Sequence, residues 1–141
     1  MNIYADTSVF GSLYLTDAHS KEAQRRMAKH PRIWLTPLHR VEWAHAVAQH
    51  VFRRTLSHQE AAQTYSAFEA DRASGLWLDT AIPDAAYETA VQLATRYGSR
   101  LGARTLDTLH VACALELKTR EFWTFDQRQE RLAKAVGLTL S

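Results

Sequence analysis

Short apolar runs alternate along the chain with longer segments in which apolar residues recur every three or four positions. The short runs are rich in β-branched and aromatic residues, which favours strands, whereas the longer spacing favours amphipathic helices. Strands are expected at residues 3–5, 32–36, 76–78, 122–125 and 138–140. Helices are expected at residues 7–10, 21–29, 37–54, 57–75, from residue 83 to a loop between Gly98 and Gly102, 105–117 and 129–136.

The helix boundaries carry recognisable signals. Thr36 followed by Pro37 provides a hydroxyl cap and a first-turn proline. Ser57 and Glu60 form a capping box, and Thr105 is expected to cap the helix that follows it. Strands that alternate with helices imply a parallel sheet covered on both faces, so we predict an α/β fold. A length of 141 residues fits one domain spanning residues 1–141.

Four acidic residues occupy equivalent places in this pattern. Asp6 and Asp126 each follow an expected strand, and Glu42 and Asp107 each lie near the start of an expected helix. In a parallel sheet all strands end at one edge, and the helix after each strand begins near that edge. The four carboxylates are therefore expected at the edge where open α/β sheets bind ligands.

Clustered carboxylates repel one another unless a cation lies among them. Mg²⁺ or Mn²⁺ prefers such oxygen ligands, and an ion held this way can activate water and stabilise charge on a phosphate oxygen. A phosphodiester is the natural substrate of such a site. Each acid has a structural alternative as a cap, a turn residue or a solvated charge. Their shared location favours a common site.

The composition changes this picture little. Hydrophobic residues make up 46% and charged residues 23% of the chain, and the net charge of +2 implies no polyanionic partner by itself. The single cysteine, Cys113, excludes an internal disulfide and fits a reducing compartment. Neither a signal peptide nor a membrane span is expected, so a cytoplasmic location is predicted. The histidines lack zinc-site spacing, and His110 is expected to be a hydrogen-bonded core residue.

The segments around the four acids carry a specific resemblance. They are Asp6-Thr7-Ser8 after an apolar strand, Val41-Glu42-Trp43, residues 106–115 with a Leu-His step after Asp107, and residues 123–126 followed by Arg128, Leu132 and Gly137. In this order they resemble a PIN-domain ribonuclease, and most closely the VapC-type toxins of bacterial type II toxin–antitoxin pairs. The bulky His39, Arg40 and Trp43 around the glutamate depart from the pattern, and residues 55–104 carry no diagnostic residue.

The resemblance implies a PIN-like three-layer α/β/α fold with a parallel sheet of about four to five strands and an acidic site at their C-terminal edge. It implies an endoribonuclease that depends on Mg²⁺ or Mn²⁺. Asp6 and Asp107 would bind the metal directly, and Glu42 and Asp126 would complete the site directly or through water. The remaining implied roles are water or phosphate orientation by Thr7, Ser8 and Thr124, and RNA phosphate contacts by Arg100, Arg104 and Arg128.

The resemblance also implies partners. They are an RNA substrate, a second copy of the chain in a homodimer, and a cognate VapB-type antitoxin docking beside the helices that contain Glu42 and Ser57. DNA would be contacted only through the antitoxin, and no membrane partner is expected. Two alternatives keep the fold: a PIN-domain nuclease of RNA processing without a toxin role, and a non-catalytic PIN-fold binding module. Aspartyl-phosphate chemistry is disfavoured because Ser8 stands where it needs a second acid.

Overall fold

The computed structural model describes residues 2–141 and is built on a parallel sheet of four strands in the order β3-β2-β1-β4. Tyr4 pairs with Phe122 and Ile33 pairs with Trp77, which sets the register between neighbouring strands. The strands are β1 (Asn2–Ala5), β2 (Arg32–Leu35), β3 (Trp77–Asp79) and β4 (Glu121–Trp123). The strand expected at residues 138–140 is reduced to a single bridge between Leu140 and Phe122.

Seven helices follow the strands in the part of the chain that the structure describes. Two of them begin with the expected capping chemistry: the Thr36 hydroxyl accepts a hydrogen bond from the His39 backbone amide, and Ser57 and Glu60 form a capping box. The helices are α1 (Thr7–Tyr14), α2 (Ser20–Met27), α3 (Pro37–Phe52), α4 (His58–Ala73), α5 (Ala85–Leu101), α6 (Thr105–Glu116) and α7 (Gln127–Ala135). Among residues 2–141 no helix combines the length and the apolar character that crossing a membrane would need.

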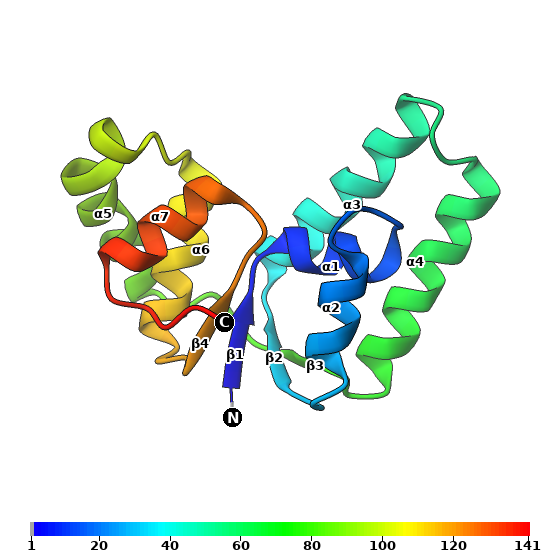
Figure 1. Cartoon of the computed structure of the whole chain (residues 1–141), viewed down its shortest axis with the longest axis horizontal. Coiled ribbons are helices and arrows are strands. Elements are labelled where there is room, and N and C mark those ends of the chain that lie inside the picture. The colour runs from blue at the N-terminus through cyan, green and yellow to red at the C-terminus, as the bar shows by residue number, and fades with distance from the viewer. Residues whose placement is uncertain (1) are drawn as a thin grey trace.

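The helices form two layers, one on each side of the sheet (Figure 1). Alternate residues of β1 enter different cores: Ile3 and Ala5 pack with α1, α3 and α4, whereas Tyr4 packs with α5, α6 and α7. Strands buried on both faces read as continuous apolar runs, which is why the short runs in the sequence were informative. The predicted three-layer α/β/α fold is confirmed.

Two glycines, Gly11 and Gly98, lie inside helices that were expected to end at or before them. Gly11 and Ser12 lie within α1, and α5 continues through Gly98 to Leu101, so that Arg96 and Arg100 are helical rather than in a loop. A glycine inside a helix costs only about 1 kcal/mol, which burial of Leu93 and Tyr97 on α5 can offset. Gly102 adopts the left-handed conformation (φ 68°) that ends the helix, and Arg104 rather than Thr105 is the N-cap of α6.

The buried face of α3 also differs from the predicted one. Helical spacing in the sequence predicts that Leu38, Val41, Ala44, Ala48 and Val51 form the core-facing stripe, but Val41 is 59% exposed. Instead His39, Trp43 and Val47 are buried. Trp43 packs against Tyr14 and Phe68, with ring centroids 5.2 and 5.3 Å away, and covers more core surface than the alanines of the predicted stripe. Leu106, whose helical spacing with Leu109, Cys113 and Leu117 also predicts burial, is 44% exposed.

Candidate active site

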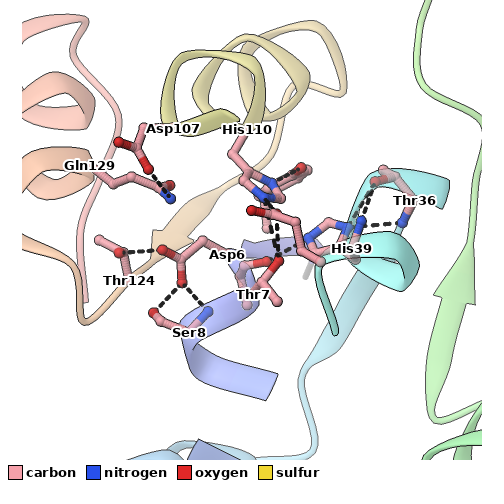
Figure 2. Close-up of polar contacts among 12 residues, drawn as sticks. Asp6, Thr7, Ser8, Thr36, His39, Asp107, His110, Thr124 and Gln129 are labelled. Atoms are coloured by element: carbon pink, nitrogen blue, oxygen red, sulfur yellow. Dashed lines mark hydrogen bonds and ion pairs between the residues drawn. The ribbon is translucent and has the colours of Figure 1, made fainter. Parts of the chain in front are cut away.

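Asp6 ends β1 and at the same time caps α1. Its Oδ1 accepts hydrogen bonds from the backbone amide and the hydroxyl of Ser8, and its Oδ2 accepts one of 2.7 Å from the Thr124 hydroxyl (Figure 2). The residue is 1% exposed, and it makes no ion pair within residues 2–141. Burial raises the pKa of Asp6, and the hydrogen bonds from Ser8 and Thr124 offset this only in part. The ionised side chain is a buried negative charge without a protein counter-ion.

Asp126 follows β4 in the same way that Asp6 follows β1. Its Oδ1 accepts hydrogen bonds from the backbone amides of Arg128 and Gln129, at 2.8 and 3.1 Å, and so caps α7. The strands β1 and β4 are parallel neighbours, and the Asp6 amide donates to the Trp123 carbonyl at 2.9 Å. The charge of Asp126 is close enough to contribute to the raised pKa of Asp6.

Asp107 lies in the first turn of α6, where it supports the helix start. Its Oδ2 accepts a hydrogen bond of 3.1 Å from the Arg104 backbone amide, and the Arg104 Nε lies 3.5 Å from the same oxygen. The buried amide of Gln129 on α7 donates to Asp107 Oδ1 at 3.3 Å. Figure 2 shows Gln129 between Asp107 and the end of β4.

Glu42 is the one candidate acid that caps no helix, since it lies inside α3. Its Oε1 accepts a hydrogen bond of 2.8 Å from the Thr7 hydroxyl and contacts Nε2 of His110. Burial acts to raise the pKa of Glu42, but the contacts with His110 and Thr7 outweigh it, so the pKa is lowered. Glu42 is therefore held as a carboxylate.

The hydroxyls predicted to orient water or phosphate have closer partners in this structure. Ser8 and Thr124 donate to Asp6, and Thr7 donates to Glu42. Their immediate effect is to fix the direction of two carboxylates. Ser8 Oγ also accepts a hydrogen bond from the Phe125 backbone amide, which connects the segment after β4 to the start of α1.

The four acids lie at one edge of the sheet but do not form a preassembled ligand cage. Within residues 2–141, no three histidine, cysteine, aspartate or glutamate side chains are grouped closely enough to hold a metal ion. The donor chemistry nevertheless fits a hard divalent cation, because the donors are carboxylates and the buried charge of Asp6 lacks a counter-ion. Mg²⁺ usually keeps several waters and takes only one or two carboxylates, so three converging ligands are not required.

A cavity of about 720 Å³ opens beside the acids between α1 and α3. Its lining includes Thr7, Ser8, Glu42 and Asp126, and exposed apolar side chains such as Leu106 form part of the wall. The cavity therefore provides space for a polymer segment next to Glu42 and Asp126, two of the four acids.

The three candidate arginines differ in their surroundings. Arg104 is beside Asp107, and Arg128 is exposed two residues after Asp126. Arg100 instead lies over the Tyr97 ring, with its guanidinium carbon 5.4 Å from the ring centroid. Arg104 thus contacts a candidate acid and Arg128 is close to another in sequence, whereas the side chain of Arg100 contacts α5 itself.

Two polar residues at the site, Gln129 and His110, were not predicted to be site residues from the sequence. Gln129 contacts Asp107, and the helical spacing that it shares with Leu132 and Ala133 on α7 could have indicated a buried polar group. His110 is fully buried and hydrogen-bonded, as predicted. Its contact with Glu42 could not be predicted from local residue spacing, because the two residues are 68 positions apart in the chain.

The fold is a three-layer α/β/α arrangement around a parallel sheet, with carboxylates at the ends of the strands. The sequence matches the PIN domain family over residues 3–135, so the chain belongs to that family. No curated protein sequence matches the chain.

Solved structures share the fold. VapC20 of Mycobacterium tuberculosis, a toxin that cleaves the sarcin–ricin loop, superposes with a TM-score of 0.72 at 20% identity, over 97% of this chain and 96% of that one. FitAcB of Neisseria gonorrhoeae gives 0.71 at 14% identity, over 98% and 95%. VapBC2 of Rickettsia felis, bound to a fragment of promoter DNA, gives 0.69 at 14% identity, over 100% and 98%. At these identities the likeness establishes the fold.

Proposed function

We propose that the chain is an endoribonuclease that requires Mg²⁺ or Mn²⁺ and acts as the toxin of a VapBC-type toxin–antitoxin pair. The observation that carries the proposal is the buried, uncompensated carboxylate of Asp6 at a sheet edge shared with Glu42, Asp107 and Asp126. The PIN family match and the fold shared with an RNA-cleaving toxin support it. The adjoining cavity supports a polymeric substrate.

Asp6 and Asp107 would hold the ion, with Glu42 and Asp126 completing its surroundings directly or through water. When bound, a divalent ion neutralises charge on the phosphate and favours ionisation of the attacking water. Ser8 and Thr124 keep the Asp6 carboxylate in one orientation through their hydroxyl protons. Water would attack phosphorus in line, without a covalent enzyme intermediate. Arg104 lies beside Asp107 and Arg128 is exposed two residues after Asp126, and both would bind neighbouring RNA phosphates.

The test of the active site is cleavage of labelled RNA by purified protein with Mg²⁺ or Mn²⁺. Asp6→Asn and Asp107→Asn should abolish cleavage, because an amide keeps the shape but loses the charge that binds the ion. Asp79 provides a matched control, since it also ends a strand but is exposed and paired with Arg72 at 2.9 Å. Asp79→Asn should cleave like wild type. Equal cleavage by all four proteins would refute the active-site assignment.

The toxin role has a separate test in cells. Induced expression should arrest growth and produce new RNA 5′ ends, which sequencing would map, and the Asp6→Asn variant should do neither. Growth arrest that persists in Asp6→Asn would argue against a nuclease toxin. Cleavage in vitro without arrest would favour the RNA-processing alternative.

An antitoxin would dock on the exposed apolar surface between α3 and α4. A groove of about 580 Å³ there is lined by residues that include Ala48, Phe52 and Tyr65, and Phe52 is 83% exposed. Known toxin–antitoxin complexes share the fold, including one from Klebsiella pneumoniae with a TM-score of 0.57. Phe52→Asp should weaken rescue by a co-expressed cognate antitoxin without reducing cleavage. A homodimer is also proposed, and its test is the mass in solution.

A further inference from the structure

A chain of polar contacts runs from the interior of the protein to the candidate acids. The Tyr4 hydroxyl lies 2.7 Å from Nδ1 of His110, and Nε2 of His110 contacts Oε1 of Glu42. Thr7 donates to the same Glu42 oxygen at 2.8 Å. Tyr4 and His110 are both fully buried, and Figure 2 shows His110 and Thr7 converging from α6 and α1. Residues of α1 and α6 therefore meet at the Glu42 carboxylate of α3, and Tyr4 of β1 reaches it through His110.

The chemistry of the groups assigns a direction to these contacts. An ionised carboxylate can only accept hydrogen bonds, so Nε2 of His110 must carry a proton toward Glu42. In the neutral imidazole Nδ1 is then an acceptor, and the Tyr4 hydroxyl is the donor that satisfies it. Burial raises the pKa of Tyr4 well above its usual value, so the hydroxyl keeps its proton. Tyr4 thereby holds the imidazole in the tautomer that donates to Glu42.

Glu42 needs such support more than the other acids do. Asp6, Asp107 and Asp126 are short side chains that also bond to backbone amides of their own helix starts. Glu42 has a longer side chain, makes no such bond, and is 23% exposed. Within residues 2–141, its Oε1 is engaged by two donors while its Oε2 accepts no hydrogen bond. One oxygen is anchored and the other remains available.

We propose that His110 is a positioning residue that, oriented by Tyr4 and assisted by Thr7, holds Glu42 Oε1 so that Oε2 serves the divalent ion or its water. The inference rests on the proposed function, because it gives Glu42 a role toward the same ion. His39 provides the contrast: it is equally buried, with its ring centroid 4.9 Å from that of His110. Among residues 2–141 it hydrogen-bonds only to the Ala5 carbonyl and to Thr36, and makes no hydrogen bond or ion pair with an acid.

The test measures Mn²⁺ affinity of the RNA-free protein by calorimetry or electron paramagnetic resonance. His110→Ala should weaken Mn²⁺ binding about 10- to 100-fold, the usual range for residues that orient a metal ligand. His110→Gln should recover most of the affinity, because its amide replaces the Nε2 donor. Tyr4→Phe and Thr7→Val each remove one contact with little change in shape, and should give smaller losses. His39→Gln should lower the melting temperature without changing Mn²⁺ affinity.

A second measurement remains decisive if the His110 variants do not fold. Long-range ¹H–¹⁵N NMR of the wild type should show a proton on Nε2 of His110, and a neutral Nδ1–H tautomer would overturn the inference. Unchanged Mn²⁺ affinity in His110→Ala and Thr7→Val would also overturn it, provided that Asp6→Asn has lost binding. If wild type and Asp6→Asn bind Mn²⁺ equally, the proposed function fails and the inference fails with it, a pattern distinct from failure of His110 alone.

Discussion

Asp6 and Glu42 lie on the same edge of the sheet, yet the protein holds their charges in opposite ways. Asp6 is surrounded by neutral donors and is almost completely buried, and its pKa is raised. Glu42 is partly exposed and contacts an imidazole, and its pKa is lowered. The free protein thus accepts an unfavourable charge at Asp6 and stabilises one at Glu42. A bound cation would therefore add most stabilisation at Asp6, which makes no ion pair within residues 2–141.

The acids also differ in what else they support. Asp6 and Asp126 cap the helices that follow their strands, and Asp107 bonds to the amide that begins α6. Capping and metal binding are therefore compatible explanations for the same aspartates, because a carboxylate has two oxygens. Glu42 caps no helix, and its contacts with Thr7 and His110 instead join α3 to α1 and α6.

The largest expected effect separates charge from structure at Asp6. Mn²⁺ at about one hundred times its dissociation constant should stabilise wild type by about 2.7 kcal/mol. Asp6→Asn should lose this stabilisation, since the proposed ligand charge is gone. Without metal the variant should be at least as stable as wild type at pH 7, because a raised folded-state pKa means that the ionised side chain opposes folding there. Chemical unfolding measures the stability with Mn²⁺ and, in the presence of a chelator, the stability without metal. Full Mn²⁺ stabilisation of Asp6→Asn would contradict the assignment of Asp6 as a metal ligand.

The opposite pKa changes of the two acids predict opposite responses to acid in metal-free protein. The lowered pKa of Glu42 stabilises the fold above its unfolded-state pKa, and this stability is lost as the pH falls through the folded-state pKa. The raised pKa of Asp6 removes stability as the pH rises from its unfolded-state to its folded-state pKa. Protonation therefore destabilises the fold at Glu42 and relieves an unfavourable charge at Asp6.

Unfolding titrations of wild type, Glu42→Gln and Asp6→Asn with chelator should therefore diverge between about pH 3 and pH 7, the range that spans ordinary carboxyl pKa values. The stability advantage of wild type over Glu42→Gln should grow with pH, and that over Asp6→Asn should shrink. Parallel curves for the two variants would show that the acids are not held differently.

A smaller effect is expected from the cap at Asp126. Asp126→Ala should destabilise the protein by about 1 kcal/mol because the amides of Arg128 and Gln129 lose their acceptor. Asp126→Asn should retain most of the stability, since asparagine caps a helix nearly as well. If the two variants reduce cleavage equally but differ in melting temperature, the structural and catalytic contributions of this residue are separate.

The smallest effects concern the arginines beside the acids. Arg104→Gln and Arg128→Gln should each reduce the salt dependence of single-stranded RNA binding by about 0.7 in the slope of log K against log salt, if each contacts one phosphate. Arg25, which is exposed and paired with Glu22 on α2, is the control whose change to glutamine should leave the slope unaltered. An unchanged slope in Arg104→Gln would exclude its phosphate contact.

Much of the fold could be predicted from the amino-acid sequence. Apolar runs such as Ile3-Tyr4-Ala5 identified the strands, because a strand buried on both faces has no polar alternation. Parallel topology then placed Asp6 and Asp126 at one edge. Packing was less predictable: α3 turns the bulky Trp43 inward rather than its alanine-rich stripe. Gly98 stays helical because the core contacts of α5 outweigh its propensity.

What the sequence alone determined is which residue types end the strands and begin the helices, since these depend on local preference and on the direction of parallel strands. Only the tertiary structure decided how the acids are held. The contact of His110 with Glu42 and that of Gln129 with Asp107 join helices distant in the chain. Such contacts depend on the relative placement of packed helices, for which local hydrophobic periodicity carries no information.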